Sequence, residues 1–240
     1  MAQEEAFLRA VLAKPNDDLP RLIFADWLDE QDQSARAEFI RVQCELTRLV
    51  DHVPEGMRLP RQLFPLILRE YIPTDQALRF DWLIQRERRL LENADAWIGA
   101  LPQHAAVNWR SNYISLEYHF ERGFASSVEF SGHSTFRSHA TRVFRAAPIR
   151  HLLMQQLTTR TAILLAYSKH LVHLKTLTVR SARIGTAGAL TLAESPYLEN
   201  LKSFRLHAVQ STAEEQAHLI GPRGRDALLA RFGDRLHISF

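Results

Sequence analysis

The chain of 240 residues contains a single cysteine, Cys44, so no disulfide can form within it. This scarcity of cysteine is typical of proteins that fold in a reducing compartment. No apolar run approaches the roughly 18 residues that a membrane-spanning helix needs. The N-terminal stretch MAQEEAFLRAVLAKPNDD is acidic and lacks the basic and apolar regions of a signal peptide. These absences predict a cytoplasmic protein with no membrane partner.

The motifs of common catalytic sites are missing as well. The sequence has no glycine-rich phosphate loop after a strand, and GHS at 132–134 is not a nucleophile elbow. His170 and His173 straddle an expected helix-to-strand turn without a nearby Cys or acid at metal-ligand spacing, and His133 and His139 are similarly isolated. Cys44 lies on an expected helix, where buried free cysteine is common. We therefore expect no enzyme activity, no cofactor and no metal site.

Charge is divided unevenly along the chain. Residues 1–120 contain 14 basic and 19 acidic residues, a net charge of −5, whereas residues 121–240 contain 16 and 8, a net charge of +8. Such a division indicates two units with different partners, or two units whose surfaces simply differ.

The spacing of apolar residues predicts several helices in the N-terminal half. Apolar residues recur at helical spacing over about 3–13, then after the N-cap candidates Asp17 or Asp18 to about Glu30, then after the N-cap candidate Ser34 to Leu49, and a longer helix is expected within 76–102. Asp26 falls on the apolar side of the second helix, and Arg36 shares the apolar side of the third. Helices joined by a short loop are commonly antiparallel neighbours. We therefore expect Asp26 to pair with Arg36 or to cap the third helix, and favour this over a catalytic or metal-binding role.

The C-terminal half contains a repeat. Apolar residues recur at i, i+3 and i+5, starting at 125, 149, 174 and 201, with a weaker last copy at Leu236 and Ile238 after a polar insertion at 210–218. Each unit reads as a strand followed by a helix, and such units bury their apolar faces by stacking on their neighbours. Within two of the units, Gly185 and Gly188 align with Gly221 and Gly224.

Together these patterns predict an α/β fold with three parts. A helical module (1–50) is followed by a helical connecting segment (51–112) and by a short leucine-rich-repeat solenoid (113–240), with a curved parallel sheet and outer helices. If Leu177 and Val179 point into the core, their neighbours point outward on that sheet. The outward positions expected to bind a partner are Thr176, Thr178, Arg180, Ser203, Arg205, His207, His151 and Gln155.

Two kinds of partner fit this surface. We favour a partner protein, because open sheets of this type are commonly binding surfaces. The alternative is nucleic acid, bound directly by the basic half or through a complex. Phosphate contacts would come from Arg180, Arg183, Lys202, Arg205, Arg223 and Arg225. These residues are spread along the sequence without interleaved aromatic residues, which disfavours nucleic acid.

The segment DDLPRLIFADWLDEQDQSARAEFIRVQCELTRL resembles the repeat-companion domain, a short helical module found beside leucine-rich-like repeats and abundant in planctomycete bacteria. The residues that carry the resemblance are Asp18, Arg21, Phe24, Ala25, Asp26, Trp27, Leu28, Arg36, Ala37, Glu38, Phe39, Ile40 and Gln43. The resemblance implies a helical cap, ribonuclease-inhibitor-like repeats and an interaction scaffold or accessory subunit without known catalytic residues. Asp26, Trp27 and Arg36 are then structural residues.

Overall fold

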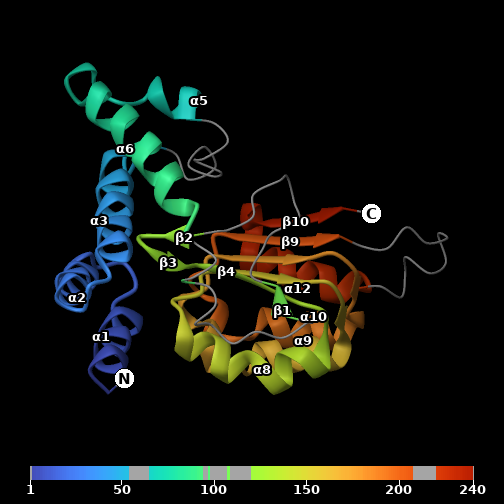
Figure 1. Cartoon of the computed structure of the whole chain (residues 1–240). Coiled ribbons are helices and arrows are strands. Elements are labelled where there is room, and N and C mark those ends of the chain that lie inside the picture. The colour runs from blue at the N-terminus through green and yellow to red at the C-terminus, as the bar shows by residue number, and fades with distance from the viewer. Residues whose placement is uncertain are drawn as a thin grey trace. The chain divides into compact units, whose positions relative to one another are not determined.

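The computed structural model of the chain describes residues 2–53, 65–93, 97, 107–108, 120–207 and 220–239. It is a mixed α/β protein that divides into two compact units (Figure 1). Unit 1 comprises Met1–Leu101 and Tyr113–Ala125, and unit 2 comprises Pro102–Asn112 and Ser126–Phe240. This division differs from the predicted ranges of 1–50, 51–112 and 113–240, because residues 77–91 and 120–125 both pack on the N-terminal helices.

Unit 1 is helical, apart from one hairpin. Its helices are α1 (Ala2–Ala13), α2 (Leu19–Glu30), α3 (Ser34–Leu49), α5 (Pro65–Arg69) and α6 (Ala77–Leu91), with a 3₁₀ turn η1 (Thr74–Gln76) before α6. The first three confirm the three helices predicted in this part of the chain, although α3 begins at Ser34 itself and not after it as a cap. Helix α6 occupies the first part of the fourth predicted helix, and Leu101 and Pro102 at its predicted end lie outside the described residues.

Aromatic rings join α1 to α2 in the core of unit 1. The ring of Trp27 lies 5.7 Å from that of Phe24 and 5.5 Å from that of Phe7, measured between centroids. The guanidinium of Arg36 lies over the Phe24 ring at 5.3 Å, and burial lowers the pKa of Arg36 although the carboxylate of Glu4 opposes this effect. Trp27 and Arg36 therefore flank the apolar core, with Arg36 paired to Glu4 at 3.3 Å.

The predicted partner of Asp26 is wrong. Asp26 is exposed, and its carboxylate pairs with Arg41 at 2.7 Å, while Arg41 also reaches Asp29 at 2.7 Å. No side chain caps α3, whose N-cap residue is Gln33. The prediction assumed that the apolar residues near Asp26 lie on the buried side of α2. Ile23, about one turn before Asp26, is itself 46% exposed, so this side of α2 faces solvent.

A hairpin, β2 (Phe120–Glu121) and β3 (Phe124–Ala125), completes unit 1. Its two-residue turn places Arg122 and Gly123 at φ of 52° and 85°, as tight hairpin turns of the mirror-image type require. A Cβ added to Gly123 would lie 2.7 Å from Cα of Ile40 on α3. Only glycine therefore allows the hairpin to approach α3 this closely.

One buried glutamine joins the hairpin to two helices. The backbone N–H of Gly123 donates to Oε1 of Gln43 at 2.7 Å, and Nε2 of Gln43 donates to Glu87 of α6 at 2.8 Å. Both Gln43 and Glu87 are fully buried. In that environment a lost hydrogen bond costs more than at the surface, so Gln43 specifies where the hairpin docks.

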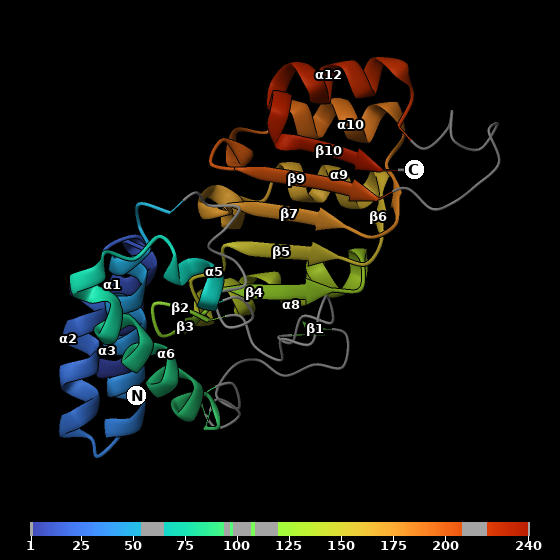
Figure 2. The same cartoon turned by 90° about the horizontal axis from the view of Figure 1, so that it is seen from above.

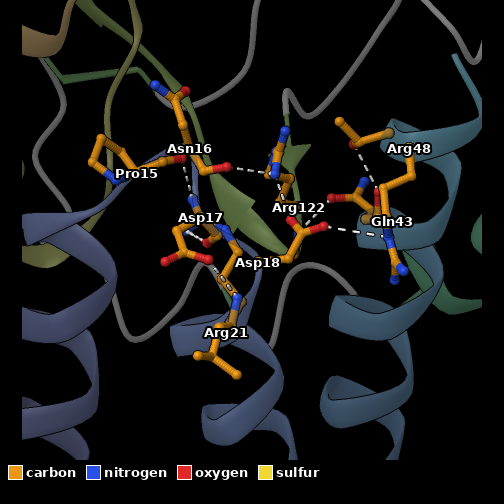
Figure 3. A network of polar contacts seen from close by, with 11 residues as sticks. Pro15, Asn16, Asp17, Asp18, Arg21, Gln43, Arg48 and Arg122 are labelled. Atoms are coloured by element: carbon orange, nitrogen blue, oxygen red, sulfur yellow. Dashed lines mark hydrogen bonds and ion pairs between the residues drawn. The ribbon is translucent and has the colours of Figure 1, made fainter. Parts of the chain in front are cut away.

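A polar network fixes the same hairpin to the loop before α2 (Figure 3). Arg122 donates to the carbonyl of Asn16 at 2.8 Å and to the carboxylate of Asp18, which also pairs with Arg48 at 3.4 Å. Arg21, which is 1% exposed, donates to the carbonyl of Pro15 at 3.1 Å, and its guanidinium lies over the ring of Phe124. Several residues that carry the family resemblance thus hold the hairpin and this loop.

Unit 2 is built on a six-stranded sheet (Figure 2). Its order is β1 (Val107–Asn108), β4 (Ser127–Phe130), β5 (His151–Met154), β7 (Thr176–Val179), β9 (Ser203–His207) and β10 (Leu236–Ser239). The last five strands are parallel, and β1 pairs with β4 in the antiparallel direction. A second parallel pair joins β6 (Leu157–Thr158) to β8 (Ala182–Arg183).

A helix follows each of four strands of the parallel sheet. The helices are α8 (His133–Ala146), α9 (Thr159–Ala166), α10 (Gly185–Ala193) and α12 (Pro222–Phe232), with 3₁₀ turns η2 (Lys169–His173), η3 (Pro196–Leu198) and η4 (Gly233–Arg235). The predicted alternation of strand and helix is confirmed. The insertion predicted at 210–218 lies outside the described residues.

The aligned glycines of the repeat lie between neighbouring helices. A Cβ at Gly188 would lie 3.1 Å from Cβ of Ala162, and one at Gly224 would lie 2.8 Å from Cβ of Ala189. The small residues let α9, α10 and α12 pack closely side by side.

We expect Gly123→Ala to lower the free energy of unfolding by about 2–5 kcal/mol, since it combines left-handed strain with a clash against Ile40. Gly185→Ala is the control, because Gly185 also has a positive φ, of +59°, but an added Cβ would meet only Oγ1 of Thr159 at an ordinary 3.5 Å. That variant should lose only about 1–2 kcal/mol. Urea titrations followed by circular dichroism measure both, and equal losses would show that the contact with Ile40 is not tight.

Candidate binding surface of unit 2

The outward side chains of the parallel strands lie in three rows, which together we call the sheet face. Because the strands pair in register, equivalent positions of successive units stand side by side. The rows contain Ser127, His151, Thr176 and Ser203; then Glu129, Leu153, Thr178, Arg205 and His237; then His207 and Ser239, with Gln155 and Arg180 continuing the alternation directly after β5 and β7. The offsets between paired positions are those expected from the repeat for the four strands from β4 to β9.

All eight residues predicted to bind a partner lie on the sheet face. Leu177 and Val179 are fully buried, while Thr176 and Thr178, which alternate with them, are half-buried, so the predicted alternation is confirmed for β7. The same alternation holds for β5 and β9, where Arg205 is exposed. At β4 the side chain on the sheet face is covered as well, since Glu129 is only 7% exposed.

Hydrogen bonds between neighbouring strands hold several of these side chains. Nδ1 of His151 lies 2.9 Å from Oγ1 of Thr176, and Nδ1 of His207 lies 2.6 Å from Oγ of Ser239. Gln155 donates to Oε1 of Glu129. Side chains that are already ordered lose less rotamer freedom when a partner binds. The sheet face is therefore partly organised for binding.

Glu129 is the acidic member of this surface. Burial raises its pKa above the usual range of a carboxyl, and the positive charge of Arg180 partly opposes this rise. Its second carboxyl oxygen, Oε2, is buried without a hydrogen-bond partner in the part of the chain that the structure describes. Glu129 is therefore a half-desolvated carboxyl on a surface whose other ionisable side chains are guanidinium and imidazole groups.

A cavity of about 390 Å³ opens where the sheet ends at β10. We call it the edge cavity. Its lining combines basic and imidazole side chains with aliphatic ones: Arg205, His207, Arg225, Leu229, Leu236, His237, Ile238 and Ser239. Arg205 and His207 come from β9, and Arg225 and Leu229 come from α12. The edge cavity thus joins the last strands of the sheet face to the last helix.

Sequence reasoning missed part of this cavity. His237 and Ser239 were not predicted, although the final copy of the repeat at Leu236 and Ile238 implies by alternation that they point outward. The sequence did not predict Leu229 as a lining residue, because an exposed leucine on a helix is common. The basic residues proposed for phosphate contacts are divided among three places: Arg180 and Arg205 on the sheet face, Arg183 and Lys202 on β8 and before β9, and Arg223 and Arg225 on α12.

The groups considered for catalysis do not form a site. Cys44 is fully buried in unit 1, and burial, reinforced by the nearby carboxylate of Asp18, raises the pKa of its thiol to about 12. Among the residues that the structure describes, no three His, Cys, Asp or Glu side chains come together as metal ligands. Within the same residues, every helix is too short or too polar to cross a lipid bilayer.

We expect Cys44 to resist alkylation by iodoacetamide at pH 8 in the folded protein and to react in urea, because the thiolate is the reactive form. The raised pKa also has a thermodynamic consequence: the contribution of Cys44 to stability is constant below about pH 9, the ordinary thiol value, and is lost as pH rises toward 12. Mass spectrometry after timed labelling measures the reaction. Complete labelling of the folded protein within minutes at pH 8 would contradict the burial of Cys44.

No family model matches the chain, and neither the curated proteins nor the solved structures include a match to it.

Proposed function

We propose that the chain is a non-catalytic interaction scaffold or accessory subunit that binds a partner protein through the sheet face of unit 2. In this proposal the strand–helix units form a short leucine-rich-repeat solenoid, and unit 1 is the repeat-companion module that the sequence resembles. The observation that carries the proposal is the in-register row of half-buried and exposed side chains across successive parallel strands.

The chemistry of the sheet face supports protein binding. Most of its side chains are short alcohols, amides and imidazoles, which donate and accept hydrogen bonds at low entropic cost. Leu153 is half-buried in the middle row and adds apolar area between Glu129 and Thr178. A protein surface offers partners for both kinds of group, and a mixed polar and apolar composition is usual for interfaces that form and dissociate.

Nucleic acid is the second candidate, and the permanent charges of Arg180, Arg205 and Arg225 support it. Arginine side chains contact phosphate groups without reading base sequence. The other basic residues proposed for phosphate contacts are Arg183 on β8, Lys202 before β9 and Arg223 on the first turn of α12, so these charges are divided among several elements. For this reason we rank nucleic acid below a partner protein.

Site-specific photo-crosslinking tests the protein partner. A benzoylphenylalanine placed at Thr178 should form an adduct with one defined protein in the cells that express this chain. The same probe at Ser138, an exposed position on α8, is the matched control and should not form that adduct. Arg205→Glu should reduce the adduct at Thr178 by about tenfold, as expected for a reversed charge beside a bound partner. Identical adducts at both positions, or none at Thr178, would overturn the proposal.

Fluorescence anisotropy with random-sequence DNA and RNA tests the second candidate. If nucleic acid binds the sheet face, affinity should fall by roughly tenfold or more between about 50 and 200 mM salt for a few phosphate contacts. The double variant Arg180→Glu/Arg205→Glu should then weaken binding at low salt. An absence of binding at both salt concentrations would remove nucleic acid as a direct ligand.

A further inference from the structure

Strand β10 is the last strand in the order of the main sheet. Within the described residues β9 is its one strand neighbour, and the register runs from Leu236 beside Phe204 to Ser239 beside His207. An edge strand presents backbone N–H and C=O groups that an extended segment of another chain can pair with. His237 and Ser239 are exposed and Ile238 is half-buried, so this edge reaches solvent.

The edge cavity lies at this strand and has two different walls. On the side of the sheet face it is lined by Arg205, His207 and His237, whose side chains carry or accept positive charge. On the side of the helices it is lined by Leu229 and Ile238, with the guanidinium of Arg225 one turn before Leu229 on α12, and Leu229 is 43% exposed. An occupant that fits both walls therefore presents negative groups to one side and apolar groups to the other.

An extended peptide can present negative groups to one wall and apolar groups to the other. Successive side chains of a strand point to opposite faces, so a segment beside β10 directs alternate residues to the sheet face and to α12. β10 itself shows this division, with His237 and Ser239 on one face and Leu236 and Ile238 on the other. A sequence that alternates acidic and aliphatic residues is complementary to both walls at once.

We propose that the edge cavity binds an extended acidic–aliphatic segment of a partner protein as an added strand beside β10. This inference rests on the proposed function, because it names the chemistry of the partner that the sheet face binds.

A free phosphate or a nucleic acid fits the edge cavity less well. Either ligand matches Arg205 and Arg225 but leaves the apolar wall of Leu229 and Ile238 uncovered. No Phe, Tyr or Trp lies among the described residues that line the cavity, so a base has no aromatic ring to stack on. The net charge of +8 in residues 121–240 also favours an acidic partner over a neutral one.

The test uses the full chain and a fluorescein-labelled peptide of alternating glutamate and valine, seven residues long and blocked at its C-terminus. Three matched peptides accompany it: one with lysine in place of glutamate, one with serine in place of valine, and one with alternate backbone nitrogens methylated. The acidic peptide should bind, as measured by anisotropy at about 100 mM salt. Each change should weaken binding by about tenfold or more, because it removes the charge, the apolar contacts or the backbone pairing.

Variants of the chain locate the peptide. Arg225→Glu/His237→Glu should weaken binding of the acidic peptide by at least about tenfold. Arg142→Glu is the control, because it reverses an exposed charge on α8 away from the edge cavity and should leave affinity unchanged. Circular dichroism shows that each variant retains its fold, and Leu229→Ala, which keeps every charge, provides a second variant that should weaken binding if the apolar wall is used.

Three outcomes would overturn this inference. Equal binding of the methylated peptide would show that backbone pairing is not used. Equal displacement of the peptide by millimolar inorganic phosphate or by single-stranded DNA would show a general anion site. Absence of peptide binding, with the crosslink at Thr178 still formed, would show that a partner uses the sheet face without adding a strand. Loss of the crosslink as well would instead remove the proposed function itself.

Discussion

The in-register pairing of β4, β5, β7 and β9 is the constraint on which the rest of unit 2 depends. Each strand is matched to the next at equivalent positions, from Ser127, His151, Thr176 and Ser203 onward. A slip of one residue in any strand would turn buried residues such as Leu177 to solvent and outward residues such as Thr178 to the core. Burial of one side of the sheet therefore also determines the composition of the other side.

The packing of helices on one side of the sheet also determines which residues occupy the sheet face. Gly188 and Gly224 allow α9, α10 and α12 to approach one another closely. Because the helices that follow the strands occupy the side of the sheet where Leu152, Leu177 and Phe204 are buried, the opposite side is left to polar residues. The sheet face and the edge cavity at its end are consequences of this packing, and their chemistry is what the proposed partner recognises.

Unit 1 depends on a different constraint, which is the pair of hydrogen bonds made by one buried glutamine. Gln43 hydrogen-bonds both to the hairpin, through Gly123, and to α6, through Glu87. The ion pairs at the surface of this unit, such as Asp26 with Arg41, contribute little by comparison because water screens exposed charges. Gln43 and Arg21, both buried, therefore have structural roles within unit 1.

Local periodicity in the sequence was enough to determine the three N-terminal helices, the alternation of strands and helices after residue 125, and the outward positions of β5, β7 and β9. These features depend on which side of an element is apolar, and that information is present in neighbouring residues. Tertiary structure alone decided that Asp26 pairs with Arg41 and not with Arg36, that Glu129 is buried, and that Arg225 and Leu229 join His237 around the edge cavity. Each of these depends on the distance between side chains from different elements, which the spacing along the chain does not contain.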